Sequence, residues 1–451
     1  MIGERAHFFP RDTIFAPASG GGRAAIAVLR LSGPACAAAL AALAPGARFP
    51  DRVATLRLLR DPVSLEPLDR ALVIRFLAPR SFTGEEMAEL HVTGGRAVIA
   101  GVVGALAKVP GLRPAEPGEF AWRAFENGKL DLSEVEGLAD LVEAETAAQR
   151  RQALRIAGGA LSRETEAIRA KLLEAMAILE AQIDFSDVED SDALSLDAAR
   201  AIVAEAARRV RAALAGAEAG ARLREGFNVV IAGPPNVGKS TLMNALARRD
   251  VSIVSAIPGT TRDLVEVSLE LKGYPVTLVD TAGIRQTEDP IECEGVARAR
   301  RRAEEADLTL WLSDAEKPLD APFPGATPTI VVLTKADRRP ASGANEDSPG
   351  APIRISALTG SGIPHLLDAV ADLAEERMTG PAPALITMER HRAAFADALG
   401  ALERALDPAA QELELVAEDL RLAARALERV AGRIDVEDVL GDIFSRLCVG
   451  K

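Results

Sequence analysis

The chain has 451 residues, a length that predicts roughly two to four domains. Its hydrophobic content of 48% and charged content of 26% are typical of globular domains with buried cores. The net charge of -13 excludes a protein that holds nucleic acid over its whole surface. Any RNA contact is therefore expected to be local or to go through a partner.

Cysteine usage and the N-terminus predict a cytoplasmic protein. Cys36, Cys293 and Cys448 are far apart in the sequence and show no metal-ligand spacing. Scattered cysteines in odd number do not build a disulfide framework, which favours a reducing compartment. The first residues, "MIGERAHFFP", lack the apolar core of a signal peptide. The apolar stretch from Ala24 to Ala44 is interrupted by charged and turn-forming residues, so we expect no membrane span there.

Residues 1–125 alternate short apolar runs with Gly and Pro turns, as in "AAIAVLRLSG", "RALVIRFLAP" and "MAELHVTGG". This pattern predicts a small α+β domain. Residues 126–220 are instead rich in Ala, Leu, Glu and Arg, and their apolar residues recur at helical spacing. The clearest series is Ile168, Leu172, Leu173, Met176 and Leu179.

A second helical region covers residues 380–451. The two regions could be separate bundles or one discontinuous α-helical domain. We favour one domain, because the segment between them has the pattern of a complete domain inserted at neighbouring chain ends.

That inserted segment, residues 221–379, alternates predicted strands with helices. Several strands, such as "FNVVIAG" and "LTLWLSD", are continuous apolar runs that suit burial on both faces of a sheet. The alternation predicts a Ras-like, doubly wound α/β domain. The whole chain is thus expected to be a multidomain α/β protein.

The motif "GPPNVGKS", Gly233 to Ser240, lies between a predicted strand and a predicted helix, as a phosphate-binding P-loop requires. Gly233 and Gly238 allow backbone N–H groups to point at phosphate oxygens, and the helix N-terminus adds a favourable dipole. Lys239 is expected to neutralise the β- and γ-phosphates. The Ser240 hydroxyl is expected to bind Mg²⁺.

Three further elements follow in the order that a GTPase requires. "PGTTRD" offers Thr261 as a switch hydroxyl for Mg²⁺ and the γ-phosphate, and "DTAG" offers Asp280, which can hold the metal through water. "TKAD" supplies Asp337, whose carboxylate can accept two hydrogen bonds from guanine but not from adenine. "SAL", Ser356 to Leu358, ends the last predicted strand. These elements together predict a GTP-binding domain.

Two positions depart from common GTPase patterns. Thr334 stands where N-K-x-D has asparagine; its hydroxyl can supply part of the same loop bracing, so guanine specificity should survive with weaker affinity. Ile284 follows the D-T-A-G motif, where Ras-like GTPases have a glutamine that orients the attacking water. An aliphatic side chain cannot do this, so another group must.

The chain resembles the MnmE (TrmE) family of bacterial tRNA-modification GTPases, within the TrmE-Era-EngA-like P-loop superfamily, over nearly its whole length. The resemblance rests on "DTIFAPASGGGRAAIAVLRLSG", "SFTGEEMAELHVTGG", "RPAEPGEFAWRAFENGKLDLSEVEGLADL", "EAQIDFSD", "PNVGKS", "IPGTTRD", "DTAGIR" and the terminal "DVLGDIFSRLCVGK". It implies a function for the segment after Ile284. In this family two GTPase domains pair when GTP is bound, and a potassium ion replaces the arginine finger.

The family pattern implies specific residues for this chemistry. Glu292 is expected to orient the attacking water through a second water and to act with Lys239 and Thr261 in catalysis. Spacing alone does not distinguish it from Glu288 and Glu294. The implied potassium ligands are Asn236, Ser255, Ile257 and Thr260. The full expected GTP-binding set is Asn236, Val237, Gly238, Lys239, Ser240, Thr241, Ser255, Thr260, Thr261, Asp280, Thr281, Ala282, Gly283, Thr334, Lys335, Asp337, Ser356, Ala357 and Leu358.

The N-terminal domain resembles a folate-binding, dimerising fold related to that of aminomethyltransferases. The resemblance implies a site for 5-formyl- or 5,10-methylene-tetrahydrofolate formed by Arg30, Glu89, Lys129 and Lys451. From sequence alone, an interpretation of these residues as ordinary strand-end and surface charges would be preferred to a ligand site. Cys448, in the terminal C-x-G-K motif, is a weak catalytic candidate, because a lone cysteine is more often a small buried hydrophobe.

The implied function is shared with a flavoprotein partner, MnmG (GidA), in a heterotetramer around a homodimer of this chain. The partner brings FAD and most of the tRNA contact, and the complex adds an aminomethyl or carboxymethylaminomethyl group to carbon 5 of the wobble uridine. One alternative is a GTP-regulated ribosome-assembly factor, but no basic RNA-binding domain flanks the GTPase segment. Another is a folate-binding scaffold with a vestigial GTPase, which the intact Lys239, Ser240, Thr261 and Asp280 argue against.

Overall fold

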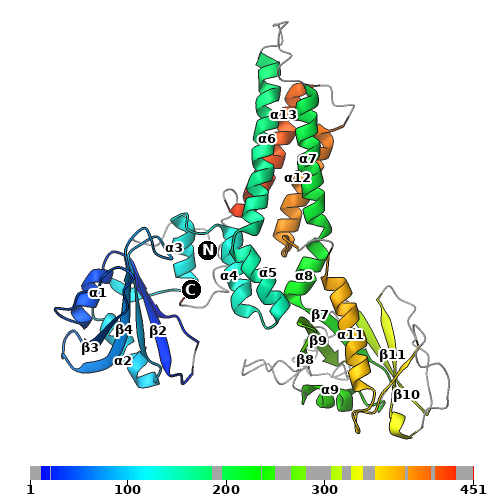
Figure 1. The fold of residues 1–451 in the computed structure, drawn as a ribbon, viewed down its shortest axis with the longest axis horizontal. Coiled ribbons are helices and arrows are strands. Elements are labelled where there is room, and N and C mark those ends of the chain that lie inside the picture. The colour runs from blue at the N-terminus through cyan, green and yellow to red at the C-terminus, as the bar shows by residue number, and fades with distance from the viewer. Residues whose placement is uncertain are drawn as a thin grey trace, which may run out of the picture. The chain divides into compact units, whose positions relative to one another are not determined.

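The computed structural model confirms a multidomain α/β protein (Figure 1). It describes residues 12–20, 22–184, 196–234, 236–248, 266–280, 306–316, 327–338, 351–380, 384–407, 412–432 and 450. The contacts divide the chain into two compact units. The first comprises Met1–Ala139, Ile156–Arg169 and Ala424–Lys451, and the second comprises Asp140–Arg155 and Ala170–Ala423. The four-segment division at residues 125, 220 and 379 stays a prediction. Within the described ranges, no helix has the length and apolar character that a membrane span needs.

The first unit contains a six-stranded sheet in the order β3-β4-β5-β2-β1-β6. Its strands are β1 (Thr13–Pro17), β2 (Ile26–Ser32), β3 (Thr55–Arg60), β4 (Pro67–Phe76), β5 (Met87–Thr93) and β6 (Leu112–Pro114). All neighbours are antiparallel except β1 and β6. Helices α1 (Cys36–Leu43) and α2 (Arg96–Leu106) supply apolar side chains to the core on one face of this sheet. Because strand side chains alternate, Arg30 and Glu89 point to the other face.

Burial determines the reactivity of the Cys36 thiol at the start of α1. The thiol is free and fully buried. Burial raises the pKa of the Cys36 thiol, and the nearby carboxylates of Glu86 and Glu85 raise it further. A thiol that stays protonated is a poor nucleophile, so Cys36 is a packing residue.

A buried ionic cluster joins the sheet to α3 (Glu119–Glu126). The Arg123 side chain, only 3% exposed, donates hydrogen bonds to Asp12 at 2.7 Å, Glu119 at 2.9 Å and Glu85 at 3.1 Å. Arg113 donates to the same Glu119 at 2.6 Å. Removal of the buried Arg123 charge would leave the buried Glu119 carboxylate with fewer compensating charges, which is destabilising. The cluster therefore fixes the loop that contains Glu85 against α3.

Helices form the described part of the chain between β6 and β7, and further helices follow the second sheet. They are α4 (Leu132–Glu143), α5 (Ala147–Ala157), α6 (Ala160–Asp184), α7 (Leu196–Ala215), α8 (Ala217–Glu225), α12 (Glu389–Ala405) and α13 (Leu413–Ala431). In the second unit, α7 packs along α12, and Arg211 pairs with Glu403 at 2.9 Å (Figure 1). Helices from before and after the inserted segment thus lie side by side.

One member of the predicted apolar series on α6 faces solvent. Ile168, Leu172, Met176 and Leu179 are buried, whereas Leu173 is 44% exposed. Leu173 follows Leu172 directly, and successive residues of a helix are about 100° apart around its axis. Leu173 therefore lies outside the buried face that the other four residues share.

The second unit contains a six-stranded sheet in the order β12-β11-β10-β7-β9-β8. Its strands are β7 (Phe227–Ala232), β8 (Glu266–Leu271), β9 (Tyr274–Asp280), β10 (Leu308–Asp314), β11 (Thr329–Thr334) and β12 (Ile353–Arg354). All pairings are parallel except that of β8 with β9. This is the predicted doubly wound arrangement.

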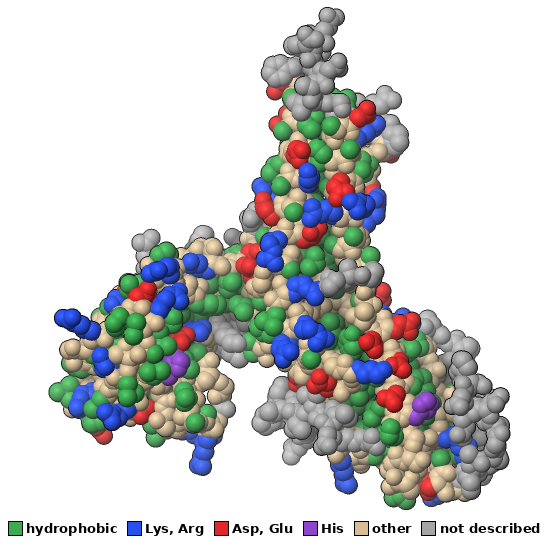
Figure 2. Space-filling view, in the orientation of Figure 1, with side chains coloured by type: hydrophobic (Ala, Val, Ile, Leu, Met, Phe, Trp, Pro, Cys, Tyr) green, Lys and Arg blue, Asp and Glu red, His purple; other side chains and the backbone are tan. Residues whose placement is uncertain are grey.

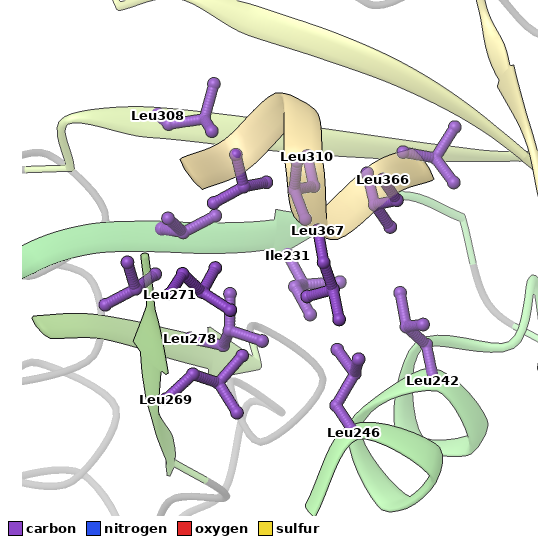
Figure 3. Packing of buried hydrophobic residues seen from close by; sticks show 14 of the residues in the cluster. Ile231, Leu242, Leu246, Leu269, Leu271, Leu278, Leu308, Leu310, Leu366 and Leu367 are labelled. Atoms are coloured by element: carbon purple, nitrogen blue, oxygen red, sulfur yellow. The ribbon is translucent and has the colours of Figure 1, made fainter. Parts of the chain in front are cut away.

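Figure 3 shows the core of this sheet, where strand leucines meet side chains of α9 (Lys239–Ala247) and α11 (Ile363–Met378). Leu242 and Leu246 come from α9, and Leu366 and Leu367 come from α11. Because β7, β9, β10 and β11 are parallel, their carboxyl ends lie at one edge of the sheet. Ligand sites of open α/β sheets form at this edge.

Candidate functional site

The loop after β7 has the backbone of a phosphate-binding loop. Gly233 has φ +149°, and a Cβ there would lie 2.4 Å from the Leu312 carbonyl oxygen. Gly238 has φ +107°, and Asn236 has φ +60°. Glycine is required where the backbone is left-handed or approaches another strand, and asparagine is among the residues that tolerate this region. The loop then enters α9 at Lys239, so the helix N-terminus lies beside it.

Lys239 and Ser240 are oriented within this loop. The Lys239 ammonium donates hydrogen bonds to the carbonyls of Gly233 at 2.8 Å and Pro234 at 3.0 Å. The Ser240 hydroxyl donates to Oδ2 of Asp280 at 3.3 Å. Asp280 ends β9 and is 3% exposed. A hydroxyl and a carboxylate this close are the hard oxygen donors that suit Mg²⁺.

Thr334 braces the P-loop from the end of β11. Its hydroxyl Oγ1 is within hydrogen-bond distance of the carbonyl oxygens of Val237 at 2.7 Å and Ser313 at 3.2 Å. The shorter contact links β11 directly to the P-loop, and Thr334 is buried. This is the bracing that the sequence suggested a threonine could supply in place of asparagine.

Lys335 and Asp337 follow Thr334 at the same edge. Lys335 has φ +57° and pairs with Asp314 at 2.7 Å, and this hydrogen bond lowers the pKa of the Asp314 carboxyl. Asp337, on a short 3₁₀ turn (Ala336–Arg338), is exposed. A hydrogen bond from the Ser356 side chain lowers the pKa of Asp337, so this carboxylate is ionised at neutral pH.

The loop after β12 lies beside this turn. The Ala336 N–H donates to the Ile355 carbonyl at 3.0 Å. Ser356 is buried, while Leu358 is 85% exposed. The segments "TKAD" and "SAL" are therefore adjacent in space, although about 20 residues separate them, as a base-recognition site requires.

A second cluster of charges lies on the face of the first sheet opposite α1 and α2. Arg30 on β2 is directly opposite Glu89 on β5, and their side chains pair at 3.1 Å. Glu89 also contacts Nε2 of His91 at 3.2 Å. Arg30 donates a further hydrogen bond to the carbonyl of Gly450 at 3.4 Å. Residues more than 400 positions apart thus meet at one site.

Aromatic rings frame the Arg30 guanidinium. The ring centres of Phe82 and Phe120 lie 5.4 Å and 5.9 Å from its central carbon, within the range of cation–π attraction. Nε of Arg30 is buried and has no hydrogen-bond partner among the described residues. A buried donor without a partner is costly, so this atom is suited to an acceptor on a bound ligand.

Lys129 lies beside the loop that carries Phe82. Gly84 in this loop has φ +79°, and a Cβ there would lie 3.3 Å from Cε of Lys129. Asn127 donates a hydrogen bond from its side chain to the Thr83 carbonyl at 2.8 Å. The segment between α3 and α4 is therefore held against the loop next to Arg30.

Comparisons with known proteins cover both units. A family model described as the GTP-binding protein TrmE N-terminus matches residues 13–129, and one described as the MnmE helical domain matches residues 132–448. A tRNA modification GTPase MnmE of Beijerinckia indica is 52% identical over 99% of this chain and 97% of its own length. Another, from Methylobacterium sp. (strain 4-46), is 55% identical over 98% of this chain and 100% of its own length.

The chain belongs to the MnmE family of tRNA modification GTPases. Among solved structures, the G domain of the T. maritima FeoB iron transporter matches 33% of this chain and 98% of that chain. Its sequence identity is 26% and its TM-score is 0.24.

The described members of the predicted GTP set lie at or after the ends of strands of the second sheet. Residues 236–241 follow β7, Asp280 ends β9, residues 334–337 follow β11, and residues 356–358 follow β12. Of the predicted folate set, Arg30 and Glu89 are in contact and Lys129 adjoins their neighbouring loop. The remaining predicted site residues lie outside the described residues: Ser255, Ile257, Thr260, Thr261, Thr281, Ala282, Gly283, Glu292, Cys448 and Lys451.

Sequence reasoning did not include three residues that lie at these two clusters. Phe82 and Phe120 flank Arg30, and Asp314 pairs with Lys335. Phe82 and Phe120 do lie within the motifs that carry the family resemblance, "SFTGEE" and "GEFAWR". Their place in these motifs could have indicated a functional role, but only the structure shows that both rings contact Arg30.

Proposed function

We propose that this MnmE family member is a potassium-activated GTPase that works with the FAD-dependent partner MnmG (GidA). Together they add an aminomethyl or carboxymethylaminomethyl group to carbon 5 of the wobble uridine in certain tRNAs, with a tetrahydrofolate as the one-carbon donor. In this proposal the chain is a cytoplasmic homodimer that forms a heterotetramer with the partner. The relatives are named as tRNA modification GTPases, which favours this function over ribosome assembly.

The observation that carries the GTPase part is the Ser240–Asp280 oxygen pair at 3.3 Å, one residue from Lys239. These donors fit Mg²⁺, which Ser240 and Thr261 would bind directly and Asp280 through water. When bound, Mg²⁺ neutralises charge on the β- and γ-phosphates. Lys239 leaves its loop carbonyls to contact the same phosphates, and the backbone N–H groups of residues 236–240 orient them.

The potassium part rests on the P-loop and the family pattern. Asn236 lies on the P-loop in the left-handed conformation, three residues before Lys239, and offers an amide oxygen, the neutral donor type that suits K⁺. Asn236, Ser255, Ile257 and Thr260 would hold the ion, which supplies the positive charge that an arginine finger provides elsewhere. Glu292 would orient the attacking water, the task that Ile284 cannot perform.

GTP hydrolysis by the purified chain is expected to be at least about tenfold faster in potassium than in sodium buffer. Replacing Glu292 with alanine is expected to lower the potassium-stimulated rate by about 10² or more, because the attacking water loses its positioning group. Hydrolysis measured in both salts checks this. Glu288→Ala and Glu294→Ala are matched controls that should retain most activity. Equal rates in both salts contradict the potassium mechanism, and a larger loss in either control assigns the water to that residue.

The folate part is supported by the chemistry of the residues around Arg30 on the first sheet. A pterin edge presents amide and amino N–H groups, from which the Glu89 carboxylate can accept hydrogen bonds. The positive charges of Arg30 and the lysines suit an anionic ligand. The buried Nε of Arg30 and the rings of Phe82 and Phe120 provide a donor and flat apolar walls. Lys129 and Lys451 would complete the site. When bound, the folate supplies the one-carbon unit.

Replacing Arg30 with glutamine is expected to weaken 5-formyl-tetrahydrofolate binding by about tenfold or more, because a charged hydrogen-bond donor is lost. Calorimetric titration of the dimer measures the affinity, and the GTP hydrolysis rate should not change. Arg70→Gln is the matched control, since Arg70 is an exposed arginine on strand β4 of the same sheet. Unchanged affinity in Arg30→Gln, or an equal loss in Arg70→Gln, contradicts this placement of the folate.

A further inference from the structure

The outer face of α5 carries three arginines. Successive residues are about 100° apart around a helix, so positions 150, 151, 154 and 155 share one side. Arg150, Arg151 and Leu154 are exposed, and Arg155 is partly exposed. The opposite side is buried and consists of Ala148, Gln152, Ala153 and Ile156. The arginines therefore form a single surface, named here the α5 arginine face: Arg150, Arg151, Leu154 and Arg155.

Hydrogen bonds hold α5 in a fixed orientation in the second unit. Thr146 and Gln149 form a reciprocal cap at the start of the helix. From its inner side, Gln149 donates to the Arg224 carbonyl at 3.1 Å, and Gln152 donates to the Gly220 carbonyl at 3.2 Å. The arginine face is thus presented on a rigid support, which lowers the entropy cost of binding a partner.

Several arginines on other helices have carboxylate partners on the same helix. Arg169, Arg208, Arg392 and Arg421 each pair with a glutamate three residues earlier. In contrast, α5 contains no acidic residue, and its three arginines make no ion pair with any described residue. Figure 2 shows Lys and Arg side chains gathered over this part of the molecule.

Several acidic groups lie near α5. Asp140, Glu143 and Glu225 line a cavity of about 190 Å³ together with Gln149 and Gln152. Asp140 is paired with Arg224 at 2.8 Å. Glu143, Glu145 and Glu225 are exposed, and none of them forms an ion pair with Arg150, Arg151 or Arg155. A chain of net charge -13 thus has a local positive surface here.

The chemistry of this face fits an RNA backbone. Guanidinium groups bind phosphates through two parallel hydrogen bonds, and the face has arginine but no lysine. A protein partner would need an apolar interface core, and the face offers only Leu154. Phosphate binding instead depends on charge. We propose that the α5 arginine face binds the phosphate backbone of the tRNA substrate directly. The proposal rests on membership of a tRNA-modifying family and not on the potassium or folate chemistry.

The test is binding of an unmodified, fluorescein-labelled tRNA transcript to the full-length chain, without nucleotide or flavoprotein. Fluorescence anisotropy gives the affinity at several NaCl concentrations from 50 to 200 mM, in the range where phosphate contacts are salt-sensitive. The variant is Arg150→Gln/Arg151→Gln/Arg155→Gln. Its affinity is expected to fall about tenfold or more. The slope of log affinity against log salt is expected to decrease in magnitude by about two to three, one unit for each lost phosphate contact.

The matched control is Arg208→Gln/Arg392→Gln/Arg421→Gln, which removes the same charge from arginines that already have partners. It should keep most of the affinity and the slope. Unchanged GTP hydrolysis and thermal unfolding show that the α5 variant is folded. If the triple variant does not fold, Arg151→Gln and Arg155→Gln separately should each reduce the slope by about one.

Three results overturn the proposal. The first is a wild-type chain that does not bind the transcript by itself. The second is an equal loss of affinity in the α5 variant and the control, which indicates a general charge effect. The third is normal tRNA binding by the α5 variant together with loss of flavoprotein binding, which assigns the face to a protein partner.

Discussion

Replacing Asp337 with asparagine is expected to weaken GTP binding by about 10²- to 10³-fold. We expect the carboxylate to accept two hydrogen bonds from the guanine N1–H and amino groups, and each such charged bond contributes about a tenfold or larger factor. The asparagine amide can accept one of them but places its own N–H₂ against the guanine amino group. Fluorescent-nucleotide titration measures the affinity.

Binding of xanthosine triphosphate distinguishes a loss of guanine recognition from a loss of folding in Asp337→Asn. Xanthine has a carbonyl where guanine has the amino group, so the asparagine N–H₂ can donate to it while the amide oxygen accepts N1–H. Asp337→Asn is therefore expected to bind xanthosine triphosphate better than GTP, and wild type the reverse. If the variant binds neither nucleotide yet unfolds at the normal temperature, or binds GTP normally, Asp337 does not recognise the base.

Local motifs made the nucleotide site predictable from sequence. The P-loop, Asp280 and the "TKAD" segment each end a strand of the same parallel sheet, and parallel strands bring such ends to one edge. Spacing therefore determined which residues meet. The position of Thr334 also followed, because a hydroxyl there can reach only groups beside the strand end. The sequence could not show which group Thr334 contacts; the structure shows that its hydroxyl donates a hydrogen bond to the Val237 carbonyl.

Contacts between distant residues were not predictable in this way. Arg123 bonds Asp12, which lies 111 positions earlier, and Arg30 meets Gly450 across 420 positions. Neither pair has a local pattern, since each depends on how the sheet and the helices pack. Leu173 shows that residue type alone does not predict burial. Leucine is common in protein cores, but the position of Leu173 around the α6 axis exposes it to solvent. Side-chain type predicts burial less well than position on a known helix.

The α5 arginines show how structure refines a conclusion from composition. Net charge excluded a broad nucleic-acid surface, and that exclusion is compatible with a local one. The sequence "QRRQALR" contains the charges, but only the structure shows that the glutamines bond inward while the arginines face out. Composition averages over surfaces, whereas RNA binding depends on a few phosphates at one place.

Replacing Lys239 with methionine is expected to lower the GTP hydrolysis rate by about 10²- to 10³-fold at saturating GTP and Mg²⁺. Methionine retains most of the side-chain volume but removes the ammonium group that contacts the β- and γ-phosphates, where negative charge develops in the transition state. Phosphate release under single-turnover conditions measures the effect. Lys272→Met, on the exposed turn between β8 and β9, is the matched control and should hydrolyse GTP normally.

The structure separates this charge effect from damage to the loop. Lys239 also bonds the carbonyls of Gly233 and Pro234, so its loss could loosen the P-loop itself. Gly233 and Pro234 are partly exposed, so their carbonyls can turn to water, whereas the loop keeps its brace from Thr334 to Val237. Binding of GDP, which lacks the γ-phosphate, should therefore fall much less than hydrolysis. An equal fall in both would mean that Lys239 acts mainly by holding the loop, and a normal hydrolysis rate would remove it from the catalytic set.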